Sequence, residues 1–255
     1  MHKFRPVFNV RVGAAVLILS MGTLAGGAQA FDETHPSLAA APAEAAAGAD
    51  ETASSAHMAL SAFDAATWDD ISIGRIDRKV FELALASAQN AVERGKADPS
   101  TLTVIDFSKP STTARMWVYD LRSRELLFEE HVAHGRNSGF DVPTSFSNQA
   151  ESNKSSLGLY RAAEAYIGKH GYSLRLDGLE PGFNDHARDR AIVIHGAEYV
   201  NADTAKTQGR LGRSLGCPAV RPEISRRLID AVKDGGLVFA YYPDAGWLGA
   251  SPYLN

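Results

Sequence analysis

One cysteine and one histidine are the residues of this chain best suited to chemistry. Cys217 is the only cysteine among the 255 residues, so it cannot form a disulfide within the chain. His195 precedes it by 22 residues, and each of the two has a glycine as a direct neighbour. A thiol becomes a strong nucleophile once a base removes its proton, and imidazole is the usual base. The pair therefore indicates covalent catalysis; the alternative is a buried, inert cysteine that packs as a small apolar residue.

The residues around this pair favour the catalytic interpretation. Residues 191–194 form an apolar run typical of a buried strand, which would deliver His195 at its end. Gly196 lets the chain turn, and a carbonyl of that turn can hold the second ring nitrogen of His195. Gly216 allows backbone N–H groups to converge where an oxyanion would develop. Because no H-E-x-x-H motif or close Cys/His cluster is present in the sequence, we expect no metal.

The first 30 residues predict a secretory signal peptide. Basic residues precede an apolar core over residues 12–24, and Ala28-Gln29-Ala30 matches a small-x-small cleavage site. Residues 31–70 are rich in Ala, Glu, Ser and Gly, which is typical of a flexible tether. We therefore expect an exported protein of the periplasm or the cell envelope. A lone thiol in such a compartment needs a reason, and a catalytic role supplies one.

The rest of the chain predicts one catalytic domain. About 190 residues remain after the tether, enough to bury a sizeable core. We assign residues 71–245 to this domain and residues 246–255 to a C-terminal tail. With 26 basic and 30 acidic residues, the net charge of −4 lacks the basic excess of a nucleic-acid binder, so no nucleic-acid partner is expected.

The apolar pattern predicts a mainly β domain of the α+β class. A helix is expected over residues 76–96, with apolar residues on one face, and a second helix between Pro222 and Gly235. The predicted fold therefore has a leading helix, one late helix and a series of strands between them. The strands are expected at 102–107, 116–121, 126–132, 157–160, 173–176, 191–195 and 237–242.

Five motifs stand out along the domain. They are V-A-H-G (132–135), F-S-N (146–148), S-S-L-G (155–158), I-V-I-H-G-A (192–197) and G-R-S-L-G-C-P-A (212–219). Together they resemble the L,D-transpeptidase (YkuD-like) catalytic domain, and within it the branch of murein L,D-transpeptidase catalytic-domain proteins. The resemblance covers residues 76–243 and implies an L,D-transpeptidase-like β-sandwich or barrel.

The resemblance also implies roles for individual residues. Cys217 would be the nucleophile, His195 its base, and the Gly196 carbonyl the group that orients the histidine. The backbone N–H groups of Leu215, Gly216 and Cys217 would form the oxyanion hole. For the substrate-binding candidates the alternative is a structural role in the loops or the core. These candidates are Arg213, as a partner for a substrate carboxylate, and Ser214, Tyr199, Phe146, Asn148, Ser156 and His134.

One position departs from the family's pattern. The wider family usually has Ser-His-Gly-Cys at the nucleophile, and here Leu215 stands in place of the histidine. Backbone oxyanion donors survive that change, whereas any side-chain role of the histidine in substrate binding is lost. Substrate details of the wider family therefore do not transfer directly to this chain.

The resemblance implies a reaction on peptidoglycan stem peptides. Cys217 would attack the bond between the diamino acid and D-Ala of a tetrapeptide stem, release D-Ala and form a thioester. An amine of another stem would then complete a 3→3 cross-link, a sequence of steps that needs no cofactor. Four alternatives stay open. They are water as acceptor (an L,D-carboxypeptidase), an envelope protein as acceptor, a non-catalytic murein-binding protein, and a sortase-like transpeptidase that uses Arg221.

Overall fold

The computed structural model describes residues 61–255. The predicted signal peptide and residues 31–60 of the predicted tether lie outside the described residues. Among residues 61–255, no helix has the length and apolar character that crossing a membrane requires.

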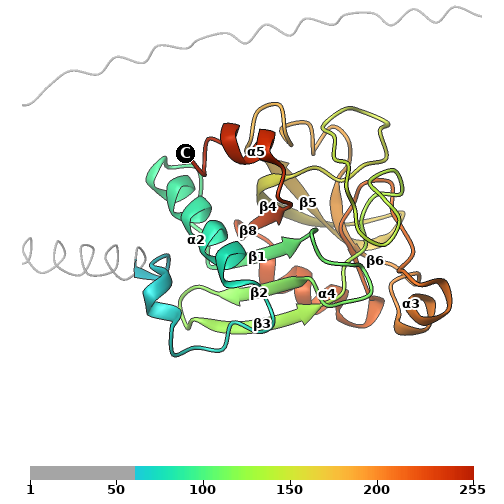
Figure 1. Cartoon of the computed structure of the whole chain (residues 1–255), viewed down its shortest axis with the longest axis horizontal. Helices are drawn as coiled ribbons and strands as arrows, with labels where there is room; N and C mark the ends of the chain where they lie inside the picture. Colours follow the sequence, from blue (N-terminus) through green and yellow to red (C-terminus); the bar gives the residue numbers. More distant parts are fainter. Residues whose placement is uncertain (1–60) are drawn as a thin grey trace, which may run out of the picture. The chain divides into compact units, whose positions relative to one another are not determined.

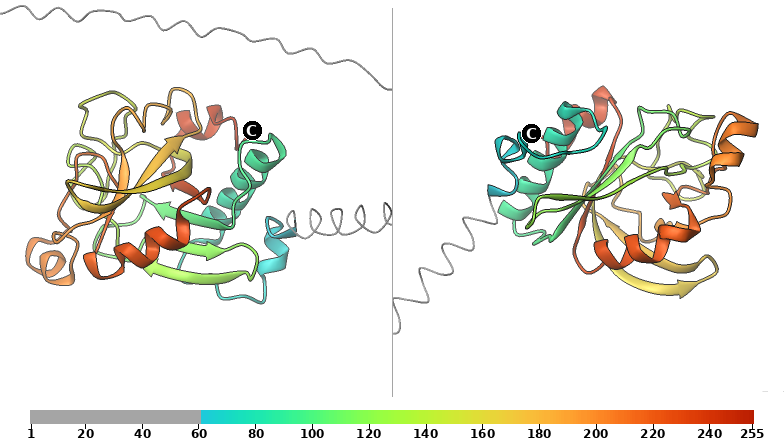
Figure 2. Two further views of the ribbon diagram at one scale, coloured as in Figure 1. Left: turned by 180° about the vertical axis from the view of Figure 1, so that it is seen from behind. Right: turned by 90° about the horizontal axis from the view of Figure 1, so that it is seen from below.

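One mixed sheet organises the described part of the chain. Its strands follow the order β3-β2-β1-β8-β4-β5-β6-β7, and the sheet curls toward a barrel (Figures 1 and 2). Neighbouring strands are antiparallel except for β1 with β8 and β6 with β7. The strands are β1 (Thr101–Asp106), β2 (Met116–Asp120), β3 (Glu125–Glu130), β4 (Gly158–Gly168), β5 (Gly171–Gly178), β6 (Val193–Gly196), β7 (Ala219–Val220) and β8 (Leu237–Tyr241).

Two helices pack against this sheet, and both were expected from the sequence. Helix α2 (Arg78–Glu93) begins at Asp77, whose carboxylate accepts two backbone N–H bonds, and it packs on β1 and β8. Helix α4 (Pro222–Val232) begins with proline, which suits the first turn, and packs mainly on β6. The two helices lie on different sides of the curled sheet (Figure 2). The predicted mainly β domain with a leading and a late helix is thus confirmed.

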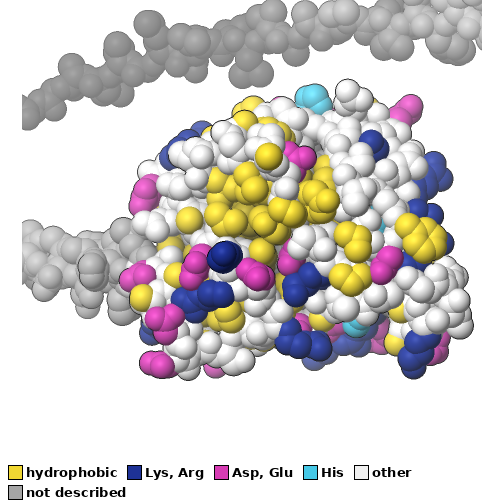
Figure 3. Space-filling view, in the orientation of Figure 1, with side chains coloured by type: hydrophobic (Ala, Val, Ile, Leu, Met, Phe, Trp, Pro, Cys, Tyr) yellow, Lys and Arg dark blue, Asp and Glu magenta, His cyan; other side chains and the backbone are white. Residues whose placement is uncertain are grey.

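Three shorter elements were not expected from the sequence. They are the 3₁₀ helix η1 (Ala65–Trp68), α3 (Ala202–Gln208) and α5 (Ala245–Ala250). Helix α5 lies within the predicted tail and buries Trp247, whose indole donates to the buried Glu180 carboxylate. The last ten residues are therefore packed against the domain. Figure 3 shows apolar side chains gathered on the surface below α5.

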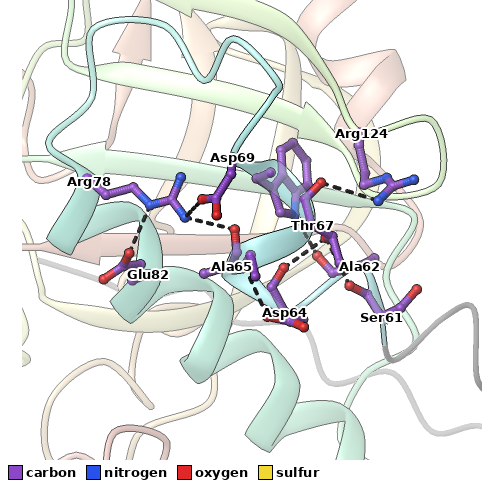
Figure 4. A network of polar contacts seen from close by, with 11 residues as sticks. Ser61, Ala62, Asp64, Ala65, Thr67, Asp69, Arg78, Glu82 and Arg124 are labelled. Carbon is purple, nitrogen blue, oxygen red and sulfur yellow. Dashed lines mark hydrogen bonds and ion pairs between the residues drawn. The ribbon is translucent and has the colours of Figure 1, made fainter.

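The predicted tether boundary at residue 70 is too late. Phe63 and Trp68 are both buried, and the Trp68 ring meets Phe81 of α2 edge-on at 5.1 Å and Tyr119 of β2 at 5.6 Å. Arg78 bonds the Asp69 carboxylate and the Ala65 carbonyl, and Arg124 donates to the Thr67 carbonyl (Figure 4). Two isolated aromatics in an Ala-rich stretch give no periodic pattern, so only their burial reveals that residues 62–68 belong to the core.

The β4–β5 hairpin is the largest difference between the predicted and observed strands. The predicted strand over 157–160 is in fact eight residues longer at its end, because β4 runs to Gly168. Alanine and charged residues between 161 and 166 obscure the alternation expected of a strand. A register shift between Ala162 and Ala165 disturbs it further. The hairpin turns at Lys169 and His170, and this turn matters for the site.

Candidate active site

Two adjacent parallel strands bring His195 and Cys217 to one place. His195 lies on β6 and pairs in register with Ala219 on β7, two residues after Cys217. His195 is 2% exposed, whereas Cys217 is partly buried. The 21 residues between the two include α3 and an arginine- and glycine-containing loop that returns to the sheet at β7. The sheet register, rather than closeness in sequence, therefore places imidazole and thiol at the same edge.

The tautomer of His195 follows from its hydrogen bond. Nδ1 lies 2.9 Å from the Gly196 carbonyl oxygen. A carbonyl can only accept, so Nδ1 carries the proton and Nε2 of the neutral ring has a free lone pair. This is the geometry that a general base with an oriented ring requires.

The thiol of Cys217 donates to the Ala191 carbonyl, with the sulfur 3.6 Å from the oxygen. Ala191 has a φ of +53°, an uncommon value for a residue with a side chain. This left-handed turn comes just before β6, so the predicted strand over 191–195 begins two residues later than expected. Nε2 of His195 makes no hydrogen bond within the described residues, so the pair is not yet engaged with each other.

Electrostatics favour the neutral forms of both groups. Burial raises the pKa of the Cys217 thiol, and the Val193 N–H, Lys169 and Arg190 lower it by less. Burial also lowers the pKa of His195, and the positive charges near it add to that effect. Imidazole and cations near a thiol ordinarily lower its pKa, but burial of Cys217 outweighs them here. The resting pair is therefore thiol and imidazole rather than thiolate and imidazolium.

Ser214 fixes the backbone of the loop that carries Cys217. Its hydroxyl donates to the Cys217 carbonyl at 2.6 Å and accepts from the Gly216 N–H at 3.1 Å. Its own N–H donates to the His134 carbonyl. Ser214 is 6% exposed, so it acts by shaping the nucleophile loop, which is the structural alternative considered for it.

The Ser214 bond also revises the expected oxyanion hole. The Gly216 N–H is already committed to Ser214 Oγ and is not free to meet a developing charge. The N–H groups of Leu215 and Cys217 have no hydrogen-bond acceptor on another residue within residues 61–255. These two groups remain as candidate donors. The sequence alone does not distinguish these two N–H groups from that of Gly216, because the hydrogen bond from Gly216 to the Ser214 side chain is visible only in the structure.

Ser155 anchors the other side of the same loop. Its buried hydroxyl donates to the Gly216 carbonyl at 3.0 Å and accepts from the Gly135 N–H at 3.0 Å. Gly216 itself has a φ of +128°, and a Cβ added there would lie 2.8 Å from the Lys154 carbonyl oxygen. Both the conformation and the contact thus require glycine before the cysteine.

His134 is not a substrate-binding residue, contrary to the expectation from its motif. It is 1% exposed, and its Nδ1 lies 2.8 Å from an Nη atom of the fully buried Arg115. Burial and the Arg115 charge lower the pKa of His134 to about 3, so the ring is neutral. The His134 carbonyl supports the loop that carries Cys217, because it accepts a hydrogen bond from the Ser214 N–H.

Asn148 and Ser156 also have their polar groups bound within the protein. The Asn148 amide donates to Asp185 and accepts from the His186 N–H, which joins two loops. Ser156 is 3% exposed, donates to the Ser147 carbonyl and accepts from Arg190. Ser156 is therefore corrected to a structural role. Asn148 is only half-buried, so its expected part in substrate binding stays a prediction.

Phe146 and Tyr199 lie differently with respect to Cys217. Phe146 packs against Phe107 and Tyr242 in an aromatic cluster and lines a cavity of about 180 Å³ near Trp247. Tyr199 is half-buried, and burial together with the Cys217 charge raises its pKa to about 12. Its side chain packs against Gly212 of the loop that leads to Cys217, where an added Cβ would collide with the Tyr199 Cβ, so its expected part in substrate binding stays a prediction.

Two residues of the β4–β5 turn were missed from the sequence. The exposed His170 ring stacks on His195 with centroids 4.4 Å apart and planes 24° from parallel. Lys169 next to it lowers the pKa of both His195 and Cys217. Ser173, three residues after His170, pairs with His195 in the sheet, so the register brings the turn to the site. No local motif marks these residues, because their position depends on the length of β4.

Arg190 is a third cation that the sequence reasoning missed. Its guanidinium donates to the carbonyls of Ser147 and Lys154 and to the Ser156 hydroxyl, so it ties the 147–156 loop to the base of the site. Its charge also lowers the pKa of Cys217. Residues 188–190 resemble any polar loop in sequence, and only the fold gives Arg190 this position.

The arginines 213 and 221 have different partners. Arg213 donates to the carbonyls of Arg136 and Gly139, and no ion pair with a carboxylate accounts for its charge within residues 61–255. Arg221 forms a bidentate ion pair with Glu130, at 2.6 and 2.8 Å. Because this guanidinium is committed to Glu130, a sortase-like role for Arg221 has no structural support.

Among the described residues, no cluster of three or more His, Cys, Asp or Glu could hold a metal.

Comparison with known proteins identifies the family. The model of the L,D-transpeptidase catalytic domain family matches residues 73–241, more than half of the chain. The chain therefore belongs to the L,D-transpeptidase catalytic domain family. No curated protein sequence matches the chain significantly.

Solved L,D-transpeptidases are distant in structure. The enzyme from Mycobacterium smegmatis is 15% identical with a TM-score of 0.36, and 56% of this chain covers 59% of that chain. L,D-transpeptidase 1 of Mycobacterium tuberculosis is 13% identical with a TM-score of 0.32, at 56% and 62% coverage. The protein from Stackebrandtia nassauensis is 13% identical with a TM-score of 0.35, at 74% and 91% coverage. These similarities say nothing of the substrate of this chain.

Proposed function

We propose that this protein is an exported peptidoglycan L,D-transpeptidase with Cys217 as nucleophile and His195 as general base. The main support is the bond from His195 Nδ1 to the Gly196 carbonyl, which leaves Nε2 free to accept a proton. The pairing of His195 with Ala219, two residues after Cys217, adds to it, as does membership of the family.

The proposed reaction begins from the neutral pair. Nε2 of His195 takes the thiol proton as the sulfur of Cys217 attacks the carbonyl carbon between the diamino acid and D-Ala. The N–H groups of Leu215 and Cys217 stabilise the oxyanion. The C–N bond then breaks, the imidazolium gives its proton to the amine of D-Ala, and a thioester remains.

An amine of a second stem completes the proposed reaction. It attacks the thioester carbonyl, gives a proton to Nε2, and the sulfur leaves and regains that proton as the thiol. A new amide bond replaces the thioester, so the overall reaction exchanges one amide for another and needs no cofactor. Release from Ala191 must precede the first step, because the thiol donates to that carbonyl at rest.

Intact-protein mass spectrometry tests this proposal directly. Residues 31–255 would be mixed with tetrapeptide-stem muropeptides, and the products would be analysed in parallel. An acyl adduct on Cys217 with released D-Ala is expected, followed by a 3→3 cross-linked product. Hydrolysed product alone would establish an L,D-carboxypeptidase instead. Binding of folded protein to murein without any adduct would favour a non-catalytic murein-binding protein.

A further inference from the structure

An exposed aromatic ring lies between two arginines next to the nucleophile loop. Phe140 is 62% exposed, although most large apolar side chains of the domain are buried. The guanidinium carbon of Arg210 lies 4.9 Å from the ring centroid, and that of Arg213 lies 5.8 Å from it. Basic and apolar side chains lie together at the edge of the molecule above α3, the helix that precedes Arg210 (Figure 3).

The charges of these two arginines are not neutralised within the described residues. Arg210 donates to the Leu211 carbonyl and Arg213 to the carbonyls of Arg136 and Gly139, so all their acceptors are neutral. The positive charge of Arg210 also contributes to the lowered pKa of Arg213. Six other arginines instead bond carboxylates: Arg75, Arg78, Arg161, Arg175, Arg188 and Arg221.

Donor groups remain for an anion at this place. Nη2 and Nε of Arg213 and Nη2 of Arg210 have no partner among residues 61–255. Arg210 Nε is buried without a partner as well. Asp141, the acid that follows Phe140 in the sequence, accepts a hydrogen bond from the Ser111 hydroxyl at 2.7 Å and pairs with neither arginine. Two uncompensated guanidinium groups are the geometry that recognises a carboxylate.

The distance to Cys217 suits a short peptide. Arg213 and Cys217 are four residues apart, so their Cα atoms are separated by at most about 14 Å. This span equals four residues of extended peptide. Leu215, which is 56% exposed, lies between them and offers an apolar surface. A peptide acylated on Cys217 therefore needs at most about four extended residues to reach the backbone of Arg213.

We propose that Arg210, Arg213 and Phe140 form a subsite for a carboxylate of the stem peptide on which Cys217 acts. The proposal rests on the proposed function, since it takes the peptide substrate from it. The arginines would bind the carboxylate, and the Phe140 face would contact the aliphatic part of the residue that carries it. The subsite would thereby select peptides whose diamino acid bears a free carboxylate over peptides in which that group is a carboxamide.

Steady-state kinetics with two peptides that differ only in this group test the subsite. For the wild-type protein, the KM should be about tenfold lower for the carboxylate than for the carboxamide, the usual worth of one charge-assisted hydrogen bond. Arg210→Gln should raise the KM for the carboxylate peptide to that of the carboxamide, with kcat within about twofold. Arg122→Gln, in the exposed β2–β3 turn, is the matched control and should change neither value.

Equal KM values for the two peptides in the wild-type protein would overturn the proposal. An equal loss for both peptides in Arg210→Gln would overturn it too, because it would mean a structural effect. Phe140→Ala gives a second reading that leaves both charges in place, and it should raise both KM values. Formation of the Cys217 adduct separates this proposal from the function itself: an adduct without discrimination refutes only the subsite, whereas no adduct refutes the function.

Discussion

Two regions contact the candidate catalytic pair, and they are built in opposite ways. The nucleophile loop, residues 212–217, is held by buried hydroxyls and carbonyls, chiefly those of Ser214, Ser155 and His134. The turn of the β4–β5 hairpin, Lys169 and His170, is exposed and meets the site through one ring stack and through charge. The loop therefore fixes where the sulfur lies, while the turn adjusts the protonation of the pair.

This difference separates two tasks: the buried loop fixes the position of the sulfur, and the exposed turn adjusts the protonation of the pair. Buried hydrogen bonds are costly to break, because a group left without a partner keeps its desolvation penalty. An exposed turn loses little when one side chain changes, because water replaces the contact. We thus expect substitutions in the loop to cost more than substitutions in the turn, and five predictions follow this order.

The largest effect is expected from the pair itself. Cys217→Ala and His195→Ala should each reduce transpeptidation by about three orders of magnitude or more, since nucleophile and base act as a unit. Thermal unfolding should show both variants folded. Substantial activity in Cys217→Ala would contradict the assignment of Cys217 as nucleophile, and the comparison of the two regions around it would then lose its meaning.

Gly216→Ala should cause the next largest loss. A Cβ would collide with the Lys154 carbonyl at 2.8 Å and strain a residue at φ +128°, so the sulfur must move. A shift of about 1 Å costs on the order of a hundredfold in rate. Gly171→Ala, in the hairpin, is the control: it too has a positive φ, but an added Cβ meets nothing within 4 Å. Equal losses in kcat would contradict the contrast between loop and turn.

Ser155→Ala should lower both stability and rate. It leaves the Gly216 carbonyl and the Gly135 N–H without partners in a buried place, at a cost of about 1–3 kcal/mol in the free energy of unfolding. Urea unfolding and kcat measure the two effects. Ser123→Ala removes an exposed hydroxyl and serves as control. A stable Ser155→Ala protein with normal kcat would show that the loop does not depend on this anchor.

His170→Phe should change the pH profile more than the maximal rate. Phenylalanine keeps a ring against His195 but removes a charge that lowers the pKa of His195. Without that charge the His195 pKa rises, so the acid limb of kcat/KM should move to higher pH. A fall of only a few fold is expected at neutral pH. An unchanged acid limb would mean that His170 does not act through its charge.

Lys169→Gln should produce the smallest effect, visible in the chemistry of the thiol. Because burial raises the pKa of Cys217, alkylation by iodoacetamide should increase with pH through the alkaline range in the wild-type protein. Removal of the Lys169 charge should raise the pKa of Cys217 slightly, so the alkylation curve should shift to higher pH. Rapid alkylation near pH 5 would instead indicate a thiolate–imidazolium pair and contradict the neutral resting state.

The chain alone contains enough information to identify the family and to propose the catalytic pair. Apolar runs predict most strands and both main helices, and the motif around Cys217 is long enough to indicate the family. Apolar runs and motifs depend on neighbours in sequence, which is why a pattern can reveal them. The two glycines of the site belong to the motifs, but the close approaches that require them come from Lys154 and Ser225, far away in the chain.

Only the tertiary structure decided which other groups meet that pair. His170, Lys169 and Arg190 come from distant segments, and strand register and hairpin length bring them there. In the same way, burial turned His134 and Ser156 from expected substrate ligands into supports, and it raised the pKa of the thiol. Burial and strand register both depend on many contacts between residues that are far apart in the sequence, so the spacing of neighbouring residues does not reveal them.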